Sequence, residues 1–372
     1  MSGKAEMRAL VIGEHLMTAS PPDRNPIILW ELTRACDLHC QNCPAGADER
    51  RGANELTTYE SYKTIDQIAA LLPRELVLTG GDPLERQDLG QLVDYARRRG
   101  LDPALVVSPT MRLTSDAVAA LARHGLRRMI FSIDGSQPAI HEAGHGVIGT
   151  FVATLLAMRW AERAGLTIEV NTLVSRRNAD DLENIVELIQ AFHPKRWNVH
   201  FPVPIGGSTH IETIAGAETE RLFATLDEIQ DREELAVRVV EAPHYRRYLL
   251  QRSLAPRLDS VIDSAIDGAR SFVYISHTGE VRASEFLPQS AGNLRYRPLG
   301  AIYRGADLFV ALRDPGNLRG KCGRCEFRDL CGGSRARAWA VSGDIFAADP
   351  LCAYEPGDQV PVASSRRPSM PA

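Results

Sequence analysis

Residues 27–44, IILWELTRACDLHCQNCP, place three cysteines directly after a short apolar run. The run predicts a buried β-strand, and Cys36, Cys40 and Cys43 follow on the loop that leaves its end. Structural zinc sites and common iron–sulfur clusters are closed by four ligands. Three clustered thiolates therefore predict a compact metal centre with one open position. The alternative is three buried structural thiols, although reactivity usually decides why a cysteine is kept.

Beyond this loop, apolar runs alternate with helical patterns. Strands are expected at residues 27–32, 75–78, 104–107, 129–133, 166–172 and 197–201, and helices after the capping-box pattern at 57–60 and at 89–98, 115–123, 152–164 and 180–191. Six such alternations with continuously apolar strands are typical of a parallel sheet covered by helices. They are too few to close an eight-stranded barrel. We expect an α/β fold, a partial (β/α)6 TIM-like barrel, with its active site at the carboxyl ends of the strands.

The rest of the chain divides by pattern into smaller parts. We expect an N-terminal extension at residues 1–25, the barrel at 26–210, bridging helices at 211–268, a small C-terminal domain at 269–355 and a disordered Pro- and Ser-rich tail at 356–372. The bridge contains helical patterns at 218–229 and 245–252, and the C-terminal domain opens with a hairpin pattern at 272–283.

Composition narrows the function classes. The chain has 43 Lys and Arg and 47 Asp and Glu, so its formal net charge is −4. This charge does not indicate a nucleic-acid or membrane partner. The absence of a long apolar run and of a signal-peptide pattern predicts a cytoplasmic protein. All seven cysteines fall into two tight groups, which in a reducing compartment indicates metal binding rather than disulfides.

The second group is Cys322, Cys325, Cys331 and Cys352. Its four thiolates suit either a structural zinc ion or a closed iron–sulfur cluster. Lys and Arg exceed Asp and Glu by ten to four between residues 295 and 337. This excess would offset a negatively charged centre or attract an acidic electron donor, and a solvated surface is the plain alternative.

Four motifs in order resemble the radical S-adenosylmethionine (SAM) superfamily: the cysteine loop, the turn Gly80, Gly81, Asp82, the turn at 132–135 and Asn171. The resemblance implies that the first three cysteines hold a 4Fe-4S cluster whose open iron binds SAM. It further implies reductive cleavage of SAM to a 5′-deoxyadenosyl radical, which abstracts hydrogen from substrate. An electron donor of flavodoxin or ferredoxin type would supply the electron.

The same resemblance implies the cofactor contacts. Gly80 and Gly81 would let the backbone approach SAM closely, because they carry no side chain. Asp82, where the family often has Glu, would hold the SAM ammonium. Ser132 and Asn171 match positions that contact the carboxylate or ribose of SAM.

The C-terminal region is similar to the SPASM extension of radical SAM enzymes. Gly279 with Ser284, the turn 331–333 and the segment 349–352 carry this likeness. The complete extension usually holds two auxiliary clusters, but Ser284 and Arg335 stand where it has further cysteines. The resemblance therefore implies one auxiliary 4Fe-4S cluster, with zinc as the alternative.

Within the superfamily, the C-terminal run is most similar to tetrapyrrole-tailoring members of alternative heme and heme d1 biosynthesis. Peptide-maturing members of pyrroloquinoline quinone and mycofactocin biosynthesis come next. The likeness implies radical modification of a carboxylate-bearing substrate, such as decarboxylation of a tetrapyrrole side chain. A ribosomal peptide, a sugar or nucleoside intermediate, and a non-enzymatic iron–sulfur carrier are the alternatives.

Substrate residues are expected in the bridge. His244, Tyr245 and Arg246 would overhang the open end of the barrel and bind or protonate a carboxylate. His141 and His145, in the run HEAGHG, are interpreted as polar loop residues because their spacing matches no complete metal site.

Overall fold

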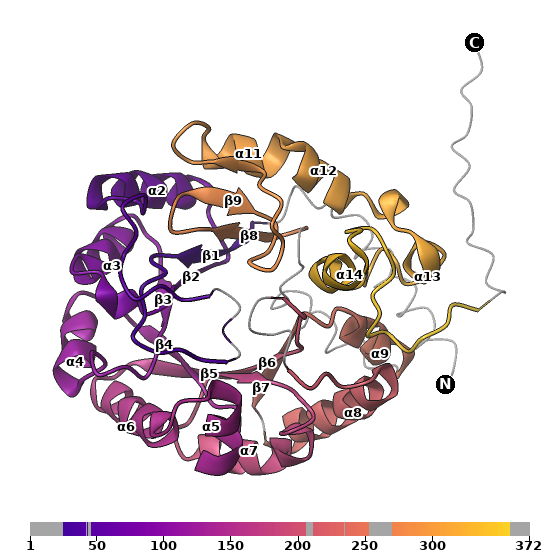
Figure 1. Cartoon of the computed structure of the whole chain (residues 1–372), viewed down its shortest axis with the longest axis horizontal. Coiled ribbons are helices and arrows are strands. Elements are labelled where there is room, and N and C mark those ends of the chain that lie inside the picture. Colours follow the sequence, from indigo (N-terminus) through magenta and orange to yellow (C-terminus); the bar gives the residue numbers. More distant parts are fainter. Residues whose placement is uncertain are drawn as a thin grey trace, which may run out of the picture.

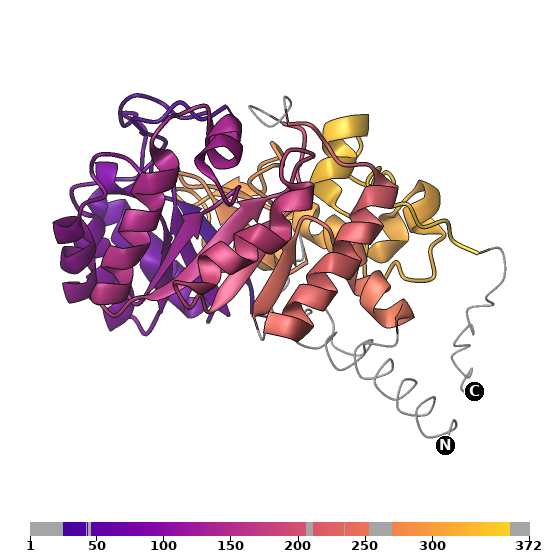
Figure 2. The same ribbon diagram turned by 90° about the horizontal axis from the view of Figure 1, so that it is seen from below.

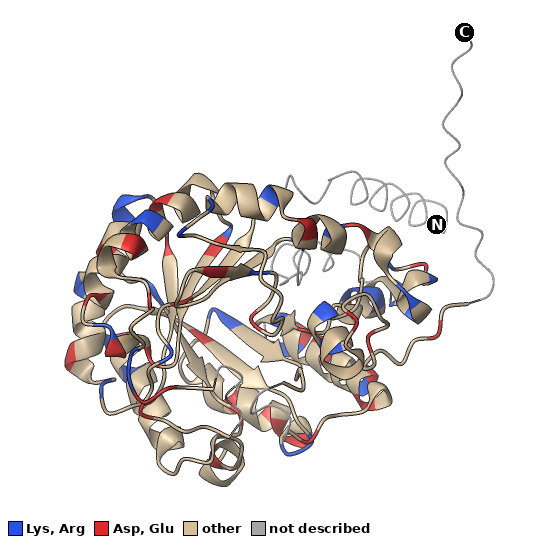
Figure 3. Ribbon diagram, turned by 45° about the horizontal axis from the view of Figure 1, so that its top comes forward, with Lys and Arg blue, Asp and Glu red and all other residues tan. Residues whose placement is uncertain are grey.

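The computed structural model describes residues 25–357, apart from 42, 44–45, 206–210, 234 and 253–269. The predicted N-terminal extension and disordered tail therefore lie almost wholly outside the described residues. Within the described part of the chain, we find no helix with the length and apolar character needed to cross a membrane. Charged residues of both signs are interspersed on the outer helices (Figure 3).

One curved sheet organises the fold (Figure 1). Its first six strands confirm the predicted parallel barrel and pair in chain order. They are β1 (Ile27–Glu31), β2 (Glu75–Thr79), β3 (Pro103–Val106), β4 (Arg128–Ser132), β5 (Thr167–Leu173) and β6 (Arg196–His200). Their continuous apolar runs are explained by burial on both faces, since one large core cluster joins strands and helices.

Helices cover the outer face of the sheet, as Figures 1 and 2 show. They are α2 (Thr58–Ala70), α3 (Leu89–Arg98), α4 (Ser115–Arg123), α6 (Thr150–Arg163), α7 (Leu182–Gln190) and α8 (Gly216–Glu233). The predicted capping box is present at α2, where the Thr57 side chain accepts from the Glu60 amide and the Glu60 carboxylate accepts from the Thr57 amide.

Four strands extend the sheet beyond the six predicted for the barrel. Strand β7 (Ala236–Val240) pairs in parallel with β6, inside the segment predicted to hold only bridging helices. Strand β8 (Phe272–Ile275) pairs in parallel with β1, and β9 (Glu280–Arg282) and β10 (Gly292–Asn293) continue antiparallel. The predicted hairpin is thus β8 and β9, but it belongs to the barrel sheet.

The remaining helices gather beside the sheet's open side (Figure 1). They are α9 (His244–Gln251), α11 (Leu299–Gly305), α12 (Asp307–Arg313), α13 (Gly320–Gly323) and α14 (Arg335–Ser342). One further helix, α5 (Pro138–His145), follows β4 in the segment interpreted as a loop, so that interpretation is wrong.

A buried ion cluster closes the amino-terminal end of the barrel. Glu75, the first residue of β2, accepts from Arg128 at 3.0 Å and from Arg196 and Arg238 at 2.7 Å. Burial would raise the pKa of Glu75, but the three guanidinium groups outweigh it and lower the pKa to about 2. This network lies at the end of the strands opposite the cysteine loop, so we assign it a role in stability.

Replacing Glu75 by Gln should lower the free energy of unfolding by about 3 kcal/mol, because the buried Arg238 loses its carboxylate partner, while Arg128 and Arg196 keep Glu169. The ionised Glu75 stabilises the fold above its unfolded pKa of 4.5, and this contribution is lost as the pH falls toward 2. Urea unfolding between pH 7 and pH 3 would measure both effects. Glu187→Gln, at an exposed position of α7, is the control. Equal stability of the two variants at pH 7 would contradict the expectation.

Candidate functional site

A cavity of about 340 Å³ opens at the carboxyl ends of the strands. Its walls include most of the predicted cofactor residues, namely Cys36, Cys40, Cys43, Gly80, Gly81, Ser132 and Asn171. The structure thus brings together side chains that are up to 135 positions apart in the chain (171 − 36). The position agrees with the general location of active sites in parallel sheets.

Backbone hydrogen bonds hold the start of the cysteine loop. The Cys36 amide donates to the Asp48 carbonyl at 2.9 Å, and the Cys43 amide to the Cys40 carbonyl at 3.2 Å. The Leu38 amide donates to the Cys36 sulfur at 3.4 Å. Burial raises the pKa of the free Cys36 thiol to about 11. Metal ligation needs the thiolate, and an amide already aimed at the sulfur favours that form.

The glycine turn after β2 packs against this loop. The Gly81 amide donates to the Thr33 carbonyl at 2.8 Å, and the Asp82 amide to the Ala35 carbonyl at 2.6 Å. A Cβ on Gly81 would lie 2.5 Å from the carbonyl oxygens of Ala35 and Arg34, and one on Gly80 would lie 2.7 Å from that of Thr33. The glycines are therefore required by backbone contact within the protein, in addition to lining the cavity.

Asp82 does not occupy the position predicted for it. Its carboxylate is fully buried, and Asp82 does not line the cavity. One oxygen accepts from the Leu84 amide at 3.0 Å and the other from the Thr110 hydroxyl at 2.6 Å. The aspartate caps the short 3-10 helix Pro83–Glu85, so the expectation that its carboxylate holds the SAM ammonium is not supported.

Ser132 ends β4 and is paired in register with Asn171 of the neighbouring strand β5. Asn198 of β6 donates its amide to the Asn171 side-chain oxygen at 2.9 Å. This bond fixes the Asn171 amide plane and leaves its NH2 group as the available donor. Sequence reasoning missed Asn198, whose position inside β6 gave no motif signal.

A histidine–carboxylate pair beside Cys40 was also missed. His145 Nε2 lies 3.0 Å from an Asp134 oxygen, and the other Asp134 oxygen accepts from the Leu173 amide at 2.7 Å. Burial would lower the pKa of His145, but hydrogen bonding to Asp134 and Cys40 outweighs it and raises the pKa to about 10. The nearby Asp134 carboxylate thus favours the imidazolium form of His145 next to the cysteine loop. The signal available was the i, i+4 spacing of His141 and His145 on α5, whose rings stack at 4.4 Å.

The opposite wall of the cavity is acidic. Glu31, Glu241 and Glu285 line it, and among the described lining residues there is no Lys or Arg. Burial, together with the neighbouring Glu241 and Glu31, raises the pKa of Glu285 to about 8. Leu29, Val106, Phe201 and Phe286 contribute apolar surface to the same cavity. The cavity thus suits a largely apolar ligand. A carboxylate of such a ligand would meet no Lys or Arg side chain at this wall.

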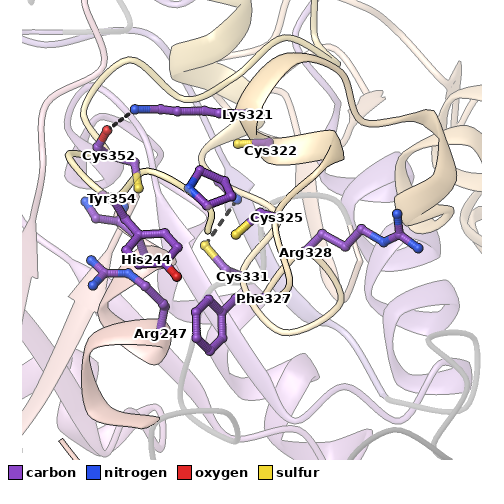
Figure 4. A pocket seen from close by; sticks show the side chains of 13 residues that line it. His244, Arg247, Lys321, Cys322, Cys325, Phe327, Arg328, Cys331, Cys352 and Tyr354 are labelled. Carbon is purple, nitrogen blue, oxygen red and sulfur yellow. Dashed lines mark hydrogen bonds between the residues drawn. The ribbon is translucent and has the colours of Figure 1, made fainter. Parts of the chain in front are cut away.

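The second cysteine group surrounds a separate pocket (Figure 4). All four of its cysteines line this pocket together with His244, Arg247 and Lys321. The Asp349 amide donates to the Cys322 sulfur and the Gly333 amide to the Cys331 sulfur, each at 3.4 Å. The Phe327 amide likewise donates to the Cys325 sulfur, and the Tyr354 amide to the Cys352 sulfur. Each thiol thus has a backbone donor before any metal is bound.

Basic side chains complement this pocket. Burial raises the pKa of Cys331 to about 12 and that of Cys352 to about 11, while Arg246 opposes the shift at Cys331 and Arg247 and Lys321 oppose it at Cys352. Arg335, which stands where the complete extension has a cysteine, donates to the Cys322 sulfur at 3.8 Å. Of the ten Lys and Arg residues between 295 and 337, Lys321 and Arg328 line this pocket and Arg335 contacts Cys322, whereas Arg295 and Arg319 pair with Glu60 and Asp344.

The predicted substrate residues lie elsewhere. His244, Tyr245 and Arg246 are all buried and do not line the barrel cavity. Tyr245 packs against Phe223 with ring centroids 5.0 Å apart, and Arg246 donates to the Leu330 carbonyl at 3.1 Å. The prediction that they contact a substrate at the open end of the barrel is wrong, because β7 places α9 against the C-terminal region.

A buried polar network joins the two cavities. Arg337 pairs with Asp349 at 3.2 Å and donates to the Glu241 carbonyl at 2.6 Å. The Ser334 amide donates to Asp349 at 2.8 Å, and the Ser334 hydroxyl donates to the Glu241 carboxylate. Glu241, which has φ of 57°, lines the barrel cavity, while Asp349 contacts Cys322. The two sites are therefore connected through continuous packing.

Comparisons with known proteins agree with this arrangement. The sequence profile of the radical SAM superfamily matches residues 30–189. The AdoMet-dependent heme synthase of Methanosarcina barkeri is 33% identical over 339 residues, covering 89% of this chain and 97% of that protein. The PqqA peptide cyclase of Rhodopseudomonas palustris is 30% identical over 346 residues, covering 88% and 87%.

Among solved structures, that of Streptococcus suis SuiB bound to S-adenosylmethionine has a TM-score of 0.70 at 17% identity, covering 88% of this chain and 77% of SuiB. This likeness concerns the fold. The identity and coverage shared with the heme synthase, together with the profile match, establish the family. The chain belongs to the radical SAM superfamily.

Proposed function

We propose that this enzyme removes a side-chain carboxylate from a tetrapyrrole, and that SAM binds in the barrel cavity beside the cysteine loop. Radical SAM enzymes use a 4Fe-4S cluster, which when loaded supplies the electron that splits a carbon–sulfur bond of SAM. Cys36, Cys40 and Cys43 would hold it. The amide aimed at the Cys36 sulfur and the positive His145 beside Cys40 support this assignment.

The cavity's other groups have proposed roles that follow from their chemistry. The Asn171 NH2 group and the Ser132 hydroxyl would donate to polar groups of SAM, and the backbone of Gly80 and Gly81 would border the same ligand. The apolar side chains would bind the substrate ring and exclude water. With Asp82 engaged in the turn, the SAM ammonium would be held by other acceptors of this wall.

The acidic wall is the observation that carries the proposed reaction. A substrate carboxylate placed near Glu31, Glu241 and Glu285 would lose its hydration and gain no cation. Loss of carbon dioxide relieves that penalty. In the balanced step, one hydrogen atom leaves the side chain, carbon dioxide departs, a vinyl group forms and one electron passes to an acceptor. The similarity to a heme synthase agrees with a tetrapyrrole substrate.

The second pocket is proposed to hold one auxiliary 4Fe-4S cluster. Four thiolates around a single zinc ion would have sulfur atoms about 3.8 Å apart, given zinc–sulfur bonds of about 2.3 Å. Among the described residues, no three Cys, His, Asp or Glu side chains converge closely enough to hold one metal ion. The backbone donors at the sulfur atoms and the basic side chains that line the pocket support a negatively charged iron–sulfur centre. Such a centre would be the nearby electron acceptor.

A ribosomal peptide is the second candidate substrate. Its support is the 30% identity to a PqqA peptide cyclase over most of both chains. A sugar or nucleoside has no comparable support, and membership of an enzyme family argues against the carrier alternative.

The test is anaerobic reconstitution followed by incubation with SAM and a reductase-coupled flavodoxin or ferredoxin. We expect 5′-deoxyadenosine formation to rise with a propionate-bearing tetrapyrrole, with or without its central iron, and the tetrapyrrole to lose carbon dioxide and two hydrogens per side chain. A peptide of PqqA type serves as the comparison. Stimulation by the peptide with an unchanged tetrapyrrole would overturn the proposed substrate.

A further inference from the structure

His244 is a buried histidine for which the described protein provides no hydrogen-bond partner. It is the first residue of α9, has 0% exposure and lines the second cysteine pocket. Neither ring nitrogen has a partner in the described structure. The Asp349 carboxylate lies 3.9 Å from Nδ1, which is beyond hydrogen-bond distance.

Leaving a buried polar group without a hydrogen bond is destabilising, so the imidazole is expected to have a partner when the site is loaded. The Phe223 ring lies on one side, with ring centroids 5.0 Å apart, and cannot accept a strong bond. The cysteine pocket is the other surface that His244 contacts (Figure 4). An imidazole has at least one N–H in any protonation state, so it can donate into this pocket.

The four cysteines already supply a complete ligand set for a cluster, so a fifth protein ligand is not needed. A side-chain N–H directed at sulfur would instead add to the backbone donors at Cys322 and Cys331. Hydrogen bonds to sulfur are among the factors that set the reduction potential of iron–sulfur clusters. They stabilise the reduced, more negative state and so raise the potential.

We propose that His244 is a positioning residue that donates a hydrogen bond to a sulfur atom of the auxiliary centre and raises its reduction potential. The inference rests on the proposed auxiliary 4Fe-4S cluster.

The experiment uses the full chain with Cys36, Cys40 and Cys43 all changed to Ser, so that the auxiliary centre alone remains. In this parent, H244F removes the donor and H244Q retains an N–H. Iron content and a redox titration followed by electron paramagnetic resonance are measured for each. Y248F is the control, since Tyr248 lies on the same helix with a buried, unpartnered hydroxyl but does not line the pocket.

We expect all variants to hold about four irons per chain, with the potential lowered in H244F and close to the parent value in H244Q and Y248F. An unchanged potential in fully loaded H244F would overturn the proposal, as would equal shifts in H244F and H244Q. If H244F holds no iron, the reduction potential of H244L is compared with that of the parent instead. Iron loss in every His244 variant would assign the residue to packing. A parent that binds zinc or no metal would refute the auxiliary cluster itself, which is a separate outcome.

Discussion

Cys36→Ala should abolish 5′-deoxyadenosine formation and lower the iron content from about eight to about four per chain. Cys36 is the buried member of the first group, and its sulfur already accepts from the Leu38 amide. With two thiolates left, the first site no longer has the three ligands that leave one metal position for SAM. The measurement is anaerobic iron counting together with chromatographic detection of 5′-deoxyadenosine under reducing conditions.

The matched control is Cys331→Ala, which removes a half-buried thiol from the other pocket. It should lose the auxiliary irons while SAM cleavage continues at the first site. Full loss of SAM cleavage in both variants would indicate general misfolding, and circular dichroism would reveal it. Unchanged SAM cleavage in Cys36→Ala would show that the first cysteine group is not the SAM site.

The local parts of the site could be predicted from sequence because each motif follows a strand directly. The cysteine loop after β1, Ser132 at the end of β4 and Asn171 within β5 all reach one edge once the strands are parallel. Periodicity therefore predicted the parallel partial barrel, and the resemblance to radical SAM enzymes implied which residues meet at the carboxyl ends of its strands.

The errors arose where contacts between distant residues decide the outcome. Strand β7 carries the buried Arg238 at its centre, and the charge of Arg238 is neutralised by Glu75, 163 positions away. The direction of the Asp82 carboxylate depends on Thr110, 28 positions on. No short pattern contains either partner.

The burial of α9 likewise could not be predicted from its sequence. The run from His244 to Arg247 is strongly polar, which predicts a solvent-exposed or substrate-facing helix. The C-terminal segments cover it, and its polar atoms face the second cysteine pocket and the backbone of residue 330. His244 and Arg247 therefore line the proposed auxiliary site and not the proposed substrate site.

Gly81→Ala should remove most of the iron bound at the first site and nearly all SAM cleavage. An alanine Cβ would lie 2.5 Å from two backbone carbonyl oxygens, those of Arg34 and Ala35, and backbone cannot yield as a flexible side chain can. The loop must then move away from the turn, which breaks the bond from the Asp82 amide to Ala35 directly before Cys36. Iron content, 5′-deoxyadenosine yield and thermal unfolding would be compared with the parent enzyme.

Gly52→Ala is the control for this change, because Gly52 precedes α2 and a Cβ there would meet its nearest atom, Cγ of Glu55, at 3.9 Å. Ordinary van der Waals contact predicts parental iron content and activity for it. If Gly81→Ala also kept its iron, the close contact between turn and loop would not be what positions the cysteines. If it kept iron but lost SAM cleavage, the turn would act on SAM directly rather than through the loop. The two readouts therefore separate the packing role of Gly81, which the distances establish, from its proposed contact with the cofactor.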